Sequence, residues 1–230
     1  MKAFLLSAGN GTRLRPLTDN IPKCLVEVNK KPLLYWWTRL FEKYGVDTVL
    51  INTHHLSDQV VDYVSKSKSK FHWNILYEQI LLGSAGTIAE HREWVSKEQY
   101  FLIVYSDVLT NCNLKRVVEY HEATGSEFTM VVAPVKEPWE KGIVEVGEGG
   151  IVTSFAEKPR KPKSNIANMG IYVCSPSIIK DIPNIRPCDI GIGLLPRLVG
   201  KARAYFSNEY FCDIGTVENL KKANDEFSGI

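Results

Sequence analysis

Short apolar segments alternate with amphipathic ones along the first half of the chain. Apolar side chains recur at steps of three and four residues between Leu33 and Tyr44, which is one face of an amphipathic helix, and Gly45 suits its C-terminal cap. Runs rich in β-branched and aromatic residues predict strands at Ala3–Leu6, Thr48–Asn52, Trp73–Tyr77, Tyr100–Tyr105 and Phe128–Val135. Further helices are predicted at Ser57–Ser65, Ala85–Val95 and Leu114–Ala123. This alternation predicts an α/β fold with a mostly parallel, doubly wound sheet covered on both faces.

The pattern changes after about residue 135. Gly142–Val146 and Ile151–Ala156 flank the sequence GEGG, which predicts a hairpin. The sequence NMGIYVCS predicts another strand, Asp189–Val199 a helix with an irregularity at Pro196, and Thr216–Phe227 a terminal helix capped by Thr216. We expect one domain over residues 1–230, with an α/β half over about 1–135 and a smaller mixed half over about 136–230.

Composition narrows the classes of partner. The formal net charge is +2, and no dense basic run of the nucleic-acid-binding type appears. No apolar segment approaches the length of a membrane span. The five cysteines are widely spaced and contain no CxxC pair, which argues against a disulfide framework or a zinc knuckle and favours a reducing cytosol. We therefore expect a cytoplasmic protein that binds neither nucleic acid nor membrane.

The chemistry is concentrated in the sequence GNGTRLRPLTDNIPKCL, from Gly9 to Leu25, directly after the first predicted strand. Ligands of doubly wound sheets bind beyond the carboxyl ends of the strands. Small residues here allow backbone N–H groups to approach a phosphate, and Arg13 adds a positive fork. The P-loop pattern fails because Lys and Ser/Thr do not follow the second glycine, and the dinucleotide fingerprint fails because its third glycine is missing.

The whole string resembles the signature of the sugar-1-phosphate nucleotidyltransferases, roughly GxGTRLxPLT followed by PK. The resemblance continues in the family's order across nearly the whole chain, at GSAGT (83–87), Asp107, FAEKP (155–159), NMGIY (168–172) and DIGT (213–216). It is strongest to the short, single-domain mannose-1-phosphate and D-manno-heptose-1-phosphate guanylyltransferases. The implied fold is a Rossmann-like nucleotidyltransferase fold with a nucleotide-binding first half and a sugar-binding second half.

The resemblance implies a reaction in which a sugar 1-phosphate attacks the α-phosphorus of a nucleoside triphosphate and releases pyrophosphate. Arg13 and Lys23 are the implied catalytic residues, Arg13 at the leaving phosphates and Lys23 where the sugar phosphate meets the α-phosphate. Asp107 and Asp213 are the implied ligands of Mg²⁺, whose preference is for hard oxygen donors. The family usually has Gly before the first aspartate, where this chain has Ser106.

The resemblance also implies the substrate contacts. Those to the sugar phosphate are Gly142, Glu157, Lys158 and Asn168, and those to the nucleotide are Leu6, Ala8, Gly9, Gly11, Thr12, Glu78, Gly83 and Ser84. Glu78 occupies the position that reads the base. A carboxylate accepts hydrogen bonds from both N1–H and the exocyclic N2–H₂ of guanine, but only one from uracil. This chemistry favours GTP, although family members that use UTP also carry Glu there, and Gln79 would suit uracil.

We therefore expect a guanylyltransferase with GTP and a mannose-like or manno-heptose 1-phosphate as substrates, acting as a monomer or homodimer. A uridylyltransferase acting on an N-acetylated amino sugar 1-phosphate is the alternative within the family. A non-catalytic sensor of nucleotides or sugar phosphates is a second alternative, because Ser106 is atypical. A glycosyltransferase is disfavoured because its usual Asp-x-Asp metal motif is missing at Asp107.

Overall fold

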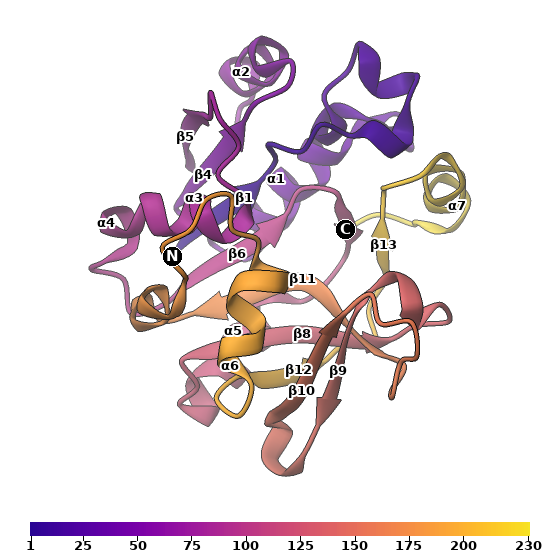
Figure 1. Cartoon of the computed structure of the whole chain (residues 1–230). Helices are drawn as coiled ribbons and strands as arrows, with labels where there is room; N and C mark the ends of the chain where they lie inside the picture. Colours follow the sequence, from indigo (N-terminus) through magenta and orange to yellow (C-terminus); the bar gives the residue numbers. More distant parts are fainter. The chain divides into compact units, whose positions relative to one another are not determined.

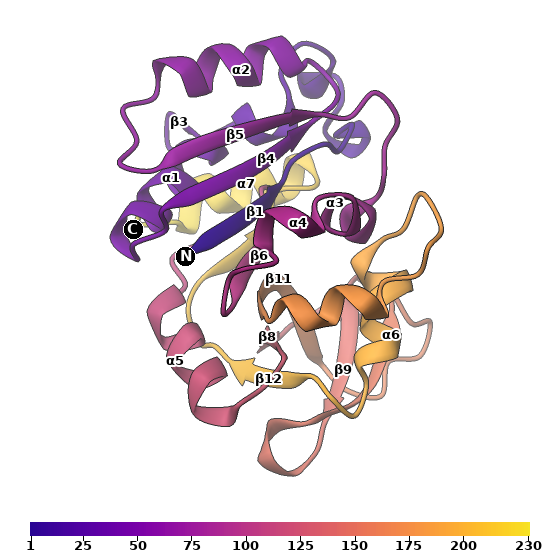
Figure 2. The same cartoon turned by 90° about the vertical axis from the view of Figure 1, so that its left-hand side faces the viewer.

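Three parallel strands form the centre of the first part of the fold. The structure, a computed structural model, describes residues 1–230. Strand β1 (Lys2–Leu6) pairs with β4 (Thr48–Thr53), and β4 pairs with β5 (His72–Tyr77), all in parallel. Figure 2 shows the three strands side by side. Strands β1 and β4 are almost wholly buried, which is why their sequences are continuous apolar runs without polar alternation.

Two helices connect these strands. Helix α1 (Leu33–Lys43) follows β1, and α2 (Ser57–Lys66) follows β4. Both helices line one groove of about 780 Å³, so they cover the same face of the sheet. This agrees with the strand order β1-β4-β5, because two successive right-handed crossovers that add strands on the same side place their helices on the same face. Helix α1 buries its apolar stripe, including Trp37 and Phe41, and ends before Gly45, whose φ of +68° allows the left-handed C-terminal turn.

Short elements complete this first unit, which comprises residues 1–81, 104–113 and 209–230. Strands β2 (Glu27–Val28) and β3 (Lys31–Pro32) form one antiparallel pair, and β7 (Val108–Thr110) and β13 (Phe211–Asp213) form another. Helix α7 (Val217–Glu226) begins at the predicted cap, where Thr216 Oγ1 accepts a hydrogen bond from the N–H of Asn219 at 3.1 Å.

The second unit comprises residues 82–103 and 114–208 and is built on a mixed sheet. Strand β11 (Ile166–Cys174) pairs antiparallel with β8 (Phe128–Pro134), which pairs in parallel with β12 (Arg203–Phe206). The predicted hairpin is confirmed as β9 (Gly142–Val146) and β10 (Val152–Glu157), seen side by side in Figure 1. Strand β6 (Phe101–Tyr105) begins in this unit and ends in the first. The functional division near residue 135 stays a prediction, because these units are defined by packing alone.

Two predicted helices are wrong in detail. The helix expected at 85–95 is divided at His91 into α3 (Ser84–Glu90) and α4 (Arg92–Val95). The helix expected at 189–199 is a π-helical turn (Ile190–Leu194) followed by α6 (Leu195–Leu198). Pro196 explains the break, because proline lacks the N–H that a helix interior needs and is tolerated in a first turn. Helix α5 (Leu114–Thr124) agrees with the prediction within one residue.

The remaining segments contain 3-10 turns. Three of them lie in the basic segment after β1, at Thr12–Leu14, Leu17–Asp19 and Lys23–Leu25. The others are at Pro138–Glu140, Glu148–Gly150 and Pro176–Asp181. The basic segment is therefore a chain of short helical turns that bury Leu14 and Thr18.

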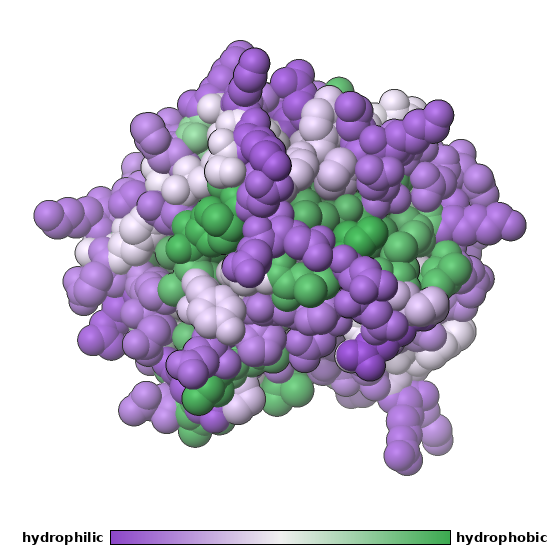
Figure 3. Space-filling model, turned by 90° about the horizontal axis from the view of Figure 1, so that it is seen from above, coloured by the Kyte–Doolittle hydropathy of each residue, from purple (hydrophilic) through white to green (hydrophobic).

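The surface is largely polar. On the face shown in Figure 3, hydrophilic residues surround a central group of apolar ones. Ile80 and Ile192 are the most exposed of the large apolar side chains. None of the helices combines the length and the apolar character that crossing a lipid bilayer demands.

Candidate functional site

Strands β7 and β13 bring two aspartates together in the first unit. Asp107 lies between β6 and β7, and Asp213 is the last residue of β13, opposite Val108 in the antiparallel register. The N–H of Ile214 donates to the carbonyl of Asp107 at 2.8 Å. The side-chain amide of Asn219, in the first turn of α7, donates to the carbonyl of Asp213 at 2.8 Å. The backbone around both carboxylates is thus held by main-chain pairing and by a helix terminus.

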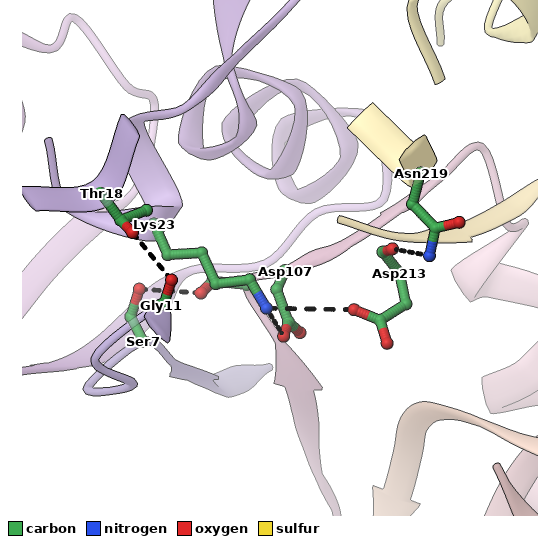
Figure 4. Close-up of polar contacts among 8 residues, drawn as sticks. Ser7, Gly11, Thr18, Lys23, Asp107, Asp213 and Asn219 are labelled. Carbon is green, nitrogen blue, oxygen red and sulfur yellow. Dashed lines mark hydrogen bonds and ion pairs between the residues drawn. The ribbon is translucent and has the colours of Figure 1, made fainter. Parts of the chain in front are cut away.

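Lys23 lies between the two carboxylates. Its Nζ donates to Asp107 Oδ2 and is 3.9 Å from Asp213 Oδ1 (Figure 4). The Lys23 side chain is only 12% exposed, against 29% for Asp107 and 25% for Asp213. One cation therefore neutralises part of the charge of two partly buried anions. The sequence predicted these three residues for the site but not their contact with one another.

Arg13 belongs to the same cluster. Its guanidinium packs over Gly215, where an added Cβ would be 3.0 Å from Nη2 of Arg13 and 2.9 Å from Oδ1 of Asp213. Gly11, with a φ of +63°, begins the turn that carries Arg13, and its carbonyl accepts from Thr18 Oγ1 at 2.7 Å. A Cβ on Gly11 would lie 2.9 Å from Thr18 Cγ2, so both the conformation and the space require glycine here.

The two aspartates have the chemistry of a divalent-cation site. Their hard carboxylate oxygens suit Mg²⁺, and a positive group already bridges them in the form of Lys23. No group of three or more His, Cys, Asp or Glu side chains is placed to hold a metal. Mg²⁺ commonly completes its octahedron with water and substrate phosphates beside one or two carboxylates. The pair therefore fits a cation that is shared with a phosphate ligand better than it fits a structural metal.

Glu78 lies elsewhere in the same unit, at the end of β5, and is 4% exposed. Its Oε1 accepts from Nδ2 of Asn52 at 2.9 Å, and Oδ1 of Asn52 accepts from the N–H of Ser7 at 2.7 Å. The hydroxyl of Ser7 donates to that of Ser106 at 2.8 Å. Sequence reasoning missed Asn52 and Ser7; the signal available was a polar Asn in the apolar run TVLINT.

The other predicted nucleotide contacts of this unit lie at the end of β1 and in the segment that follows it. Leu6 and Ala8 are buried at the end of β1, whereas Gly9 and Thr12 are exposed beyond it. His55, which follows β4, bonds through Nε2 to the carbonyl of Thr18 at 2.9 Å. The segment that follows β4 therefore supports the basic segment that follows β1.

In the second unit, Gly83 and Ser84 pack against the segment around Cys188. The N–H groups of Ala85 and Gly86 both donate to the Cys188 carbonyl, at 2.9 and 3.0 Å. Gly83 has a φ of +77°, and an added Cβ would be 2.5 Å from that same carbonyl oxygen. Ser84 donates through its N–H and its hydroxyl to Asp189 Oδ1, at 3.2 and 3.3 Å. Asp189 is a third residue that the sequence did not predict at the site.

The predicted sugar contacts lie together on three neighbouring strands of this unit. Gly142 pairs with Glu157, and the β9–β11 register (Ile143 with Ala167) places Asn168 on the other side of Gly142. An added Cβ on Gly142 would be 2.9 Å from Glu157 Oε2. Asn168 donates to the hydroxyl of Tyr172 at 2.6 Å.

The carboxyl group of Glu157 has a perturbed environment. Burial by the surrounding protein raises its pKa above the ordinary value, the Lys158 ammonium opposes this rise, and the Asp189 carboxylate adds to it. Lys158 adopts a φ of +44°, which is unusual for a residue other than glycine, asparagine or aspartate. Such backbone strain persists where the surroundings over-determine a conformation, as they often do at ligand sites.

Comparison with known proteins finds relatives over most of the chain. The chain is 34% identical over 221 residues to the mannose-1-phosphate guanylyltransferase catalytic subunit beta of Xenopus tropicalis, covering 94% of this chain and 61% of that protein. It is 29% identical to a UTP–glucose-1-phosphate uridylyltransferase of Synechocystis, over 97% of this chain and 62% of that one. The chain thus spans about three fifths of the length of the curated relatives it matches.

Solved structures share the whole fold. HddC from Yersinia pseudotuberculosis, complexed with GMP-PN, superposes with a TM-score of 0.83 and 26% identity over 99% of both chains. The family model described as nucleotidyl transferase matches residues 2–228. This match spans both units and every motif described above, and the chain therefore belongs to the nucleotidyl transferase family.

Proposed function

We propose that this protein transfers a guanylyl group from GTP to a sugar 1-phosphate and releases pyrophosphate, forming a GDP-sugar. The observation that carries the proposal is the cluster of Lys23, Asp107 and Asp213 at the ends of the strands, with Arg13 beside it. Family membership, the relative named mannose-1-phosphate guanylyltransferase and the GMP-PN complex of HddC support the same reaction class. A mannose-like or manno-heptose 1-phosphate is the proposed acceptor.

The reaction needs positioned phosphates and neutralised charge, and no covalent protein intermediate. A phosphate oxygen of the sugar 1-phosphate attacks the α-phosphorus, and the bond from that phosphorus to the oxygen of the leaving pyrophosphate breaks. An ammonium has three donors, so Lys23 is able to bind a phosphate oxygen while it keeps contact with the aspartates. Arg13 is suited to the leaving phosphates, where its planar fork offers two parallel hydrogen bonds.

Mg²⁺ is the proposed cofactor, held by Asp107 and Asp213. When bound, it supplies positive charge next to the phosphates and so offsets the charge that moves to the pyrophosphate. The two carboxylates keep 25–29% of their side-chain surface exposed, which leaves them accessible to a hydrated cation.

Glu78 is the proposed reader of the base. An ionised carboxylate is an acceptor only, which matches the two N–H donors on the guanine edge and mismatches the carbonyls that flank N3–H of uracil. The backbone at Gly83 and Ser84 is proposed to lie close to the nucleoside. Gly142, Glu157, Lys158 and Asn168 are proposed to contact the sugar phosphate, and their side-by-side placement on three strands favours a shared ligand.

The test combines each of the four common NTPs, with Mg²⁺, with manno-configured and N-acetylated amino sugar 1-phosphates. The measured quantity is the rate of pyrophosphate release for each combination. We expect the highest kcat/KM with GTP and a manno-configured sugar 1-phosphate. Preference for UTP would replace this proposal by the uridylyltransferase, which the Synechocystis relative supports. Binding of nucleotide without pyrophosphate release for any sugar would favour a sensor.

A further inference from the structure

Three consecutive residues after the middle of β4 hold Glu78 in place. The Glu78 N–H donates to the carbonyl of Thr53 at 2.9 Å, which continues the parallel ladder. The Glu78 carbonyl accepts from Nδ1 of His54 at 2.7 Å, so this ring nitrogen carries the proton. Asn52 adds the side-chain contact, from Nδ2 to Oε1 at 2.9 Å. The backbone of Glu78 and one of its carboxylate oxygens are therefore both held by β4.

The orientation of the Asn52 amide is determined by its other partner. Oδ1 of Asn52 accepts from the N–H of Ser7 at 2.7 Å. A backbone N–H only donates, so the oxygen of the amide must face Ser7 and the NH₂ group must face Glu78. Asn52 and Glu78 are each 4% exposed, so water does not readily replace these bonds.

We infer that Asn52 is the positioning residue that sets guanine selectivity through Glu78. This inference rests on the proposed role of Glu78 in GTP recognition. The terminal torsion of a glutamate is broad and roughly two-fold, so an unsupported carboxylate samples several planes. Donation by Asn52 to Oε1 fixes that plane, and with it the direction in which the carboxylate presents its oxygens to the base.

The two contacts of Asn52 have different consequences for different nucleotides. The bond to Ser7 supports the segment after β1, which serves the phosphates of any NTP. The bond to Glu78 serves only the base. Loss of Asn52 should therefore lower kcat/KM for GTP and for UTP together through Ser7, and lower it further for GTP alone through Glu78. The ratio of the two kcat/KM values isolates the second effect.

The experiment is a double-mutant cycle of Asn52→Leu and Glu78→Gln, with kcat/KM for GTP and UTP and equilibrium binding of both nucleotides. Each single variant should reduce the GTP-to-UTP ratio by about tenfold, the size expected for one hydrogen bond to a charged group. The double variant should show the ratio of Glu78→Gln alone, because Asn52 affects the ratio only through Glu78. Asn52→Ser, whose hydroxyl is too short to reach both partners, should reduce the ratio as well and serves if Asn52→Leu does not fold.

Ile51→Val is the matched control. Ile51 precedes Asn52 in β4, is fully buried and has an apolar side chain, so the variant disturbs packing without removing a hydrogen bond to Glu78. It should leave the GTP-to-UTP ratio unchanged. A ratio that falls in Ile51→Val as much as in Asn52→Leu would overturn the inference, because the effect would then follow from packing.

The remaining outcomes separate this inference from the proposed function. If Glu78→Gln reduces the ratio and neither Asn52 variant does, Asn52 does not position the carboxylate, and the GTP proposal stands. If the losses in the ratio add in the double variant, Asn52 acts independently of Glu78 and the inference is overturned. A wild-type protein that binds GTP no better than UTP overturns the guanine proposal itself, and the inference with it.

Discussion

Replacement of Lys23 by Met removes the cation between the two aspartates and keeps the length of the side chain. At the observed 3.9 Å from Asp213, a unit charge contributes about 4 kcal/mol of Coulomb attraction at an effective dielectric constant of 20. Desolvation of the 12% exposed ammonium offsets much of this. We expect the free energy of unfolding to fall by about 1–3 kcal/mol without divalent cation, less than for a fully buried pair.

The same variant should bind Mg²⁺ more tightly while turning over more slowly. Lys23 and Mg²⁺ compete for the same carboxylates. Removing the ammonium should therefore increase the Mg²⁺ affinity in the absence of nucleotide by about tenfold or more, which is the size of effect expected from removing one neighbouring positive charge. Turnover should fall by about 10²–10³, the usual effect of losing one preorganised donor at a reacting centre. Calorimetric Mg²⁺ titration, urea unfolding with EDTA or Mg²⁺, and pyrophosphate release measure the three quantities.

Lys66→Met is the control for the loss of a lysine ion pair. Lys66 contacts Asp62 at 2.7 Å on α2, but the side chains are 74% and 61% exposed, so the pair contributes little to stability. This variant should change neither Mg²⁺ affinity nor turnover. A Lys23→Met protein with normal turnover and unchanged Mg²⁺ affinity would refute both the catalytic role of Lys23 and the competition for the aspartates.

Three further predictions follow from the site and the core. Asp107→Asn and Asp213→Asn should each raise the Mg²⁺ concentration for half-maximal turnover, because an amide keeps the shape but loses the charge; normal activity of both at low Mg²⁺ would contradict the metal site. Gly83→Ala should lower the free energy of unfolding by roughly 1–3 kcal/mol in urea, given its φ of +77° and the 2.5 Å approach to Cys188; an unchanged midpoint would contradict this. Burial lowers the pKa of His121 below its ordinary 6.5, so the folded state takes up this proton less readily than the unfolded state. The contribution of His121 to stability is complete above pH 6.5 and is lost as the pH falls below it. In urea unfolding, the free energy of unfolding of His121→Gln should therefore fall less steeply below pH 6.5 than that of the wild-type protein.

The regular elements could be predicted from the sequence where burial follows a strict period. The apolar stripe of α1 and the continuous apolar runs of β1 and β4 leave little choice of structure, and these predictions are confirmed within one or two residues. The sequence predicts a helix over 189–199 with an irregularity at Pro196, and the structure has a break there. The π-helical turn before the break, which contains two glycines, is not predictable from a helical pattern alone.

The candidate site residues could be predicted from the sequence because each lies in a short motif that is contiguous along the chain. The motifs did not predict that Lys23 lies between Asp107 and Asp213, because this depends on the pairing of β7 with β13 across a long stretch of sequence. Asn52 and Asp189 were missed for a related reason. Each acts by hydrogen bonds to residues distant in the chain, and a single Asn or Asp in sequence carries no sign of its partner.

Ser106 shows how a departure from the family pattern is accommodated by its neighbours. The motif usually has Gly before the first aspartate, and a side chain there risks crowding the proposed metal site. In this protein Ser106 is 4% exposed, and its hydroxyl accepts a hydrogen bond from Ser7 Oγ in the segment after β1. The N–H of Ser106 also donates to the carbonyl of Leu6 at 3.0 Å, which extends the pairing beyond β6. The added hydroxyl thus has a hydrogen-bond partner within the Ser7–Asn52–Glu78 network, which accommodates its burial at this position.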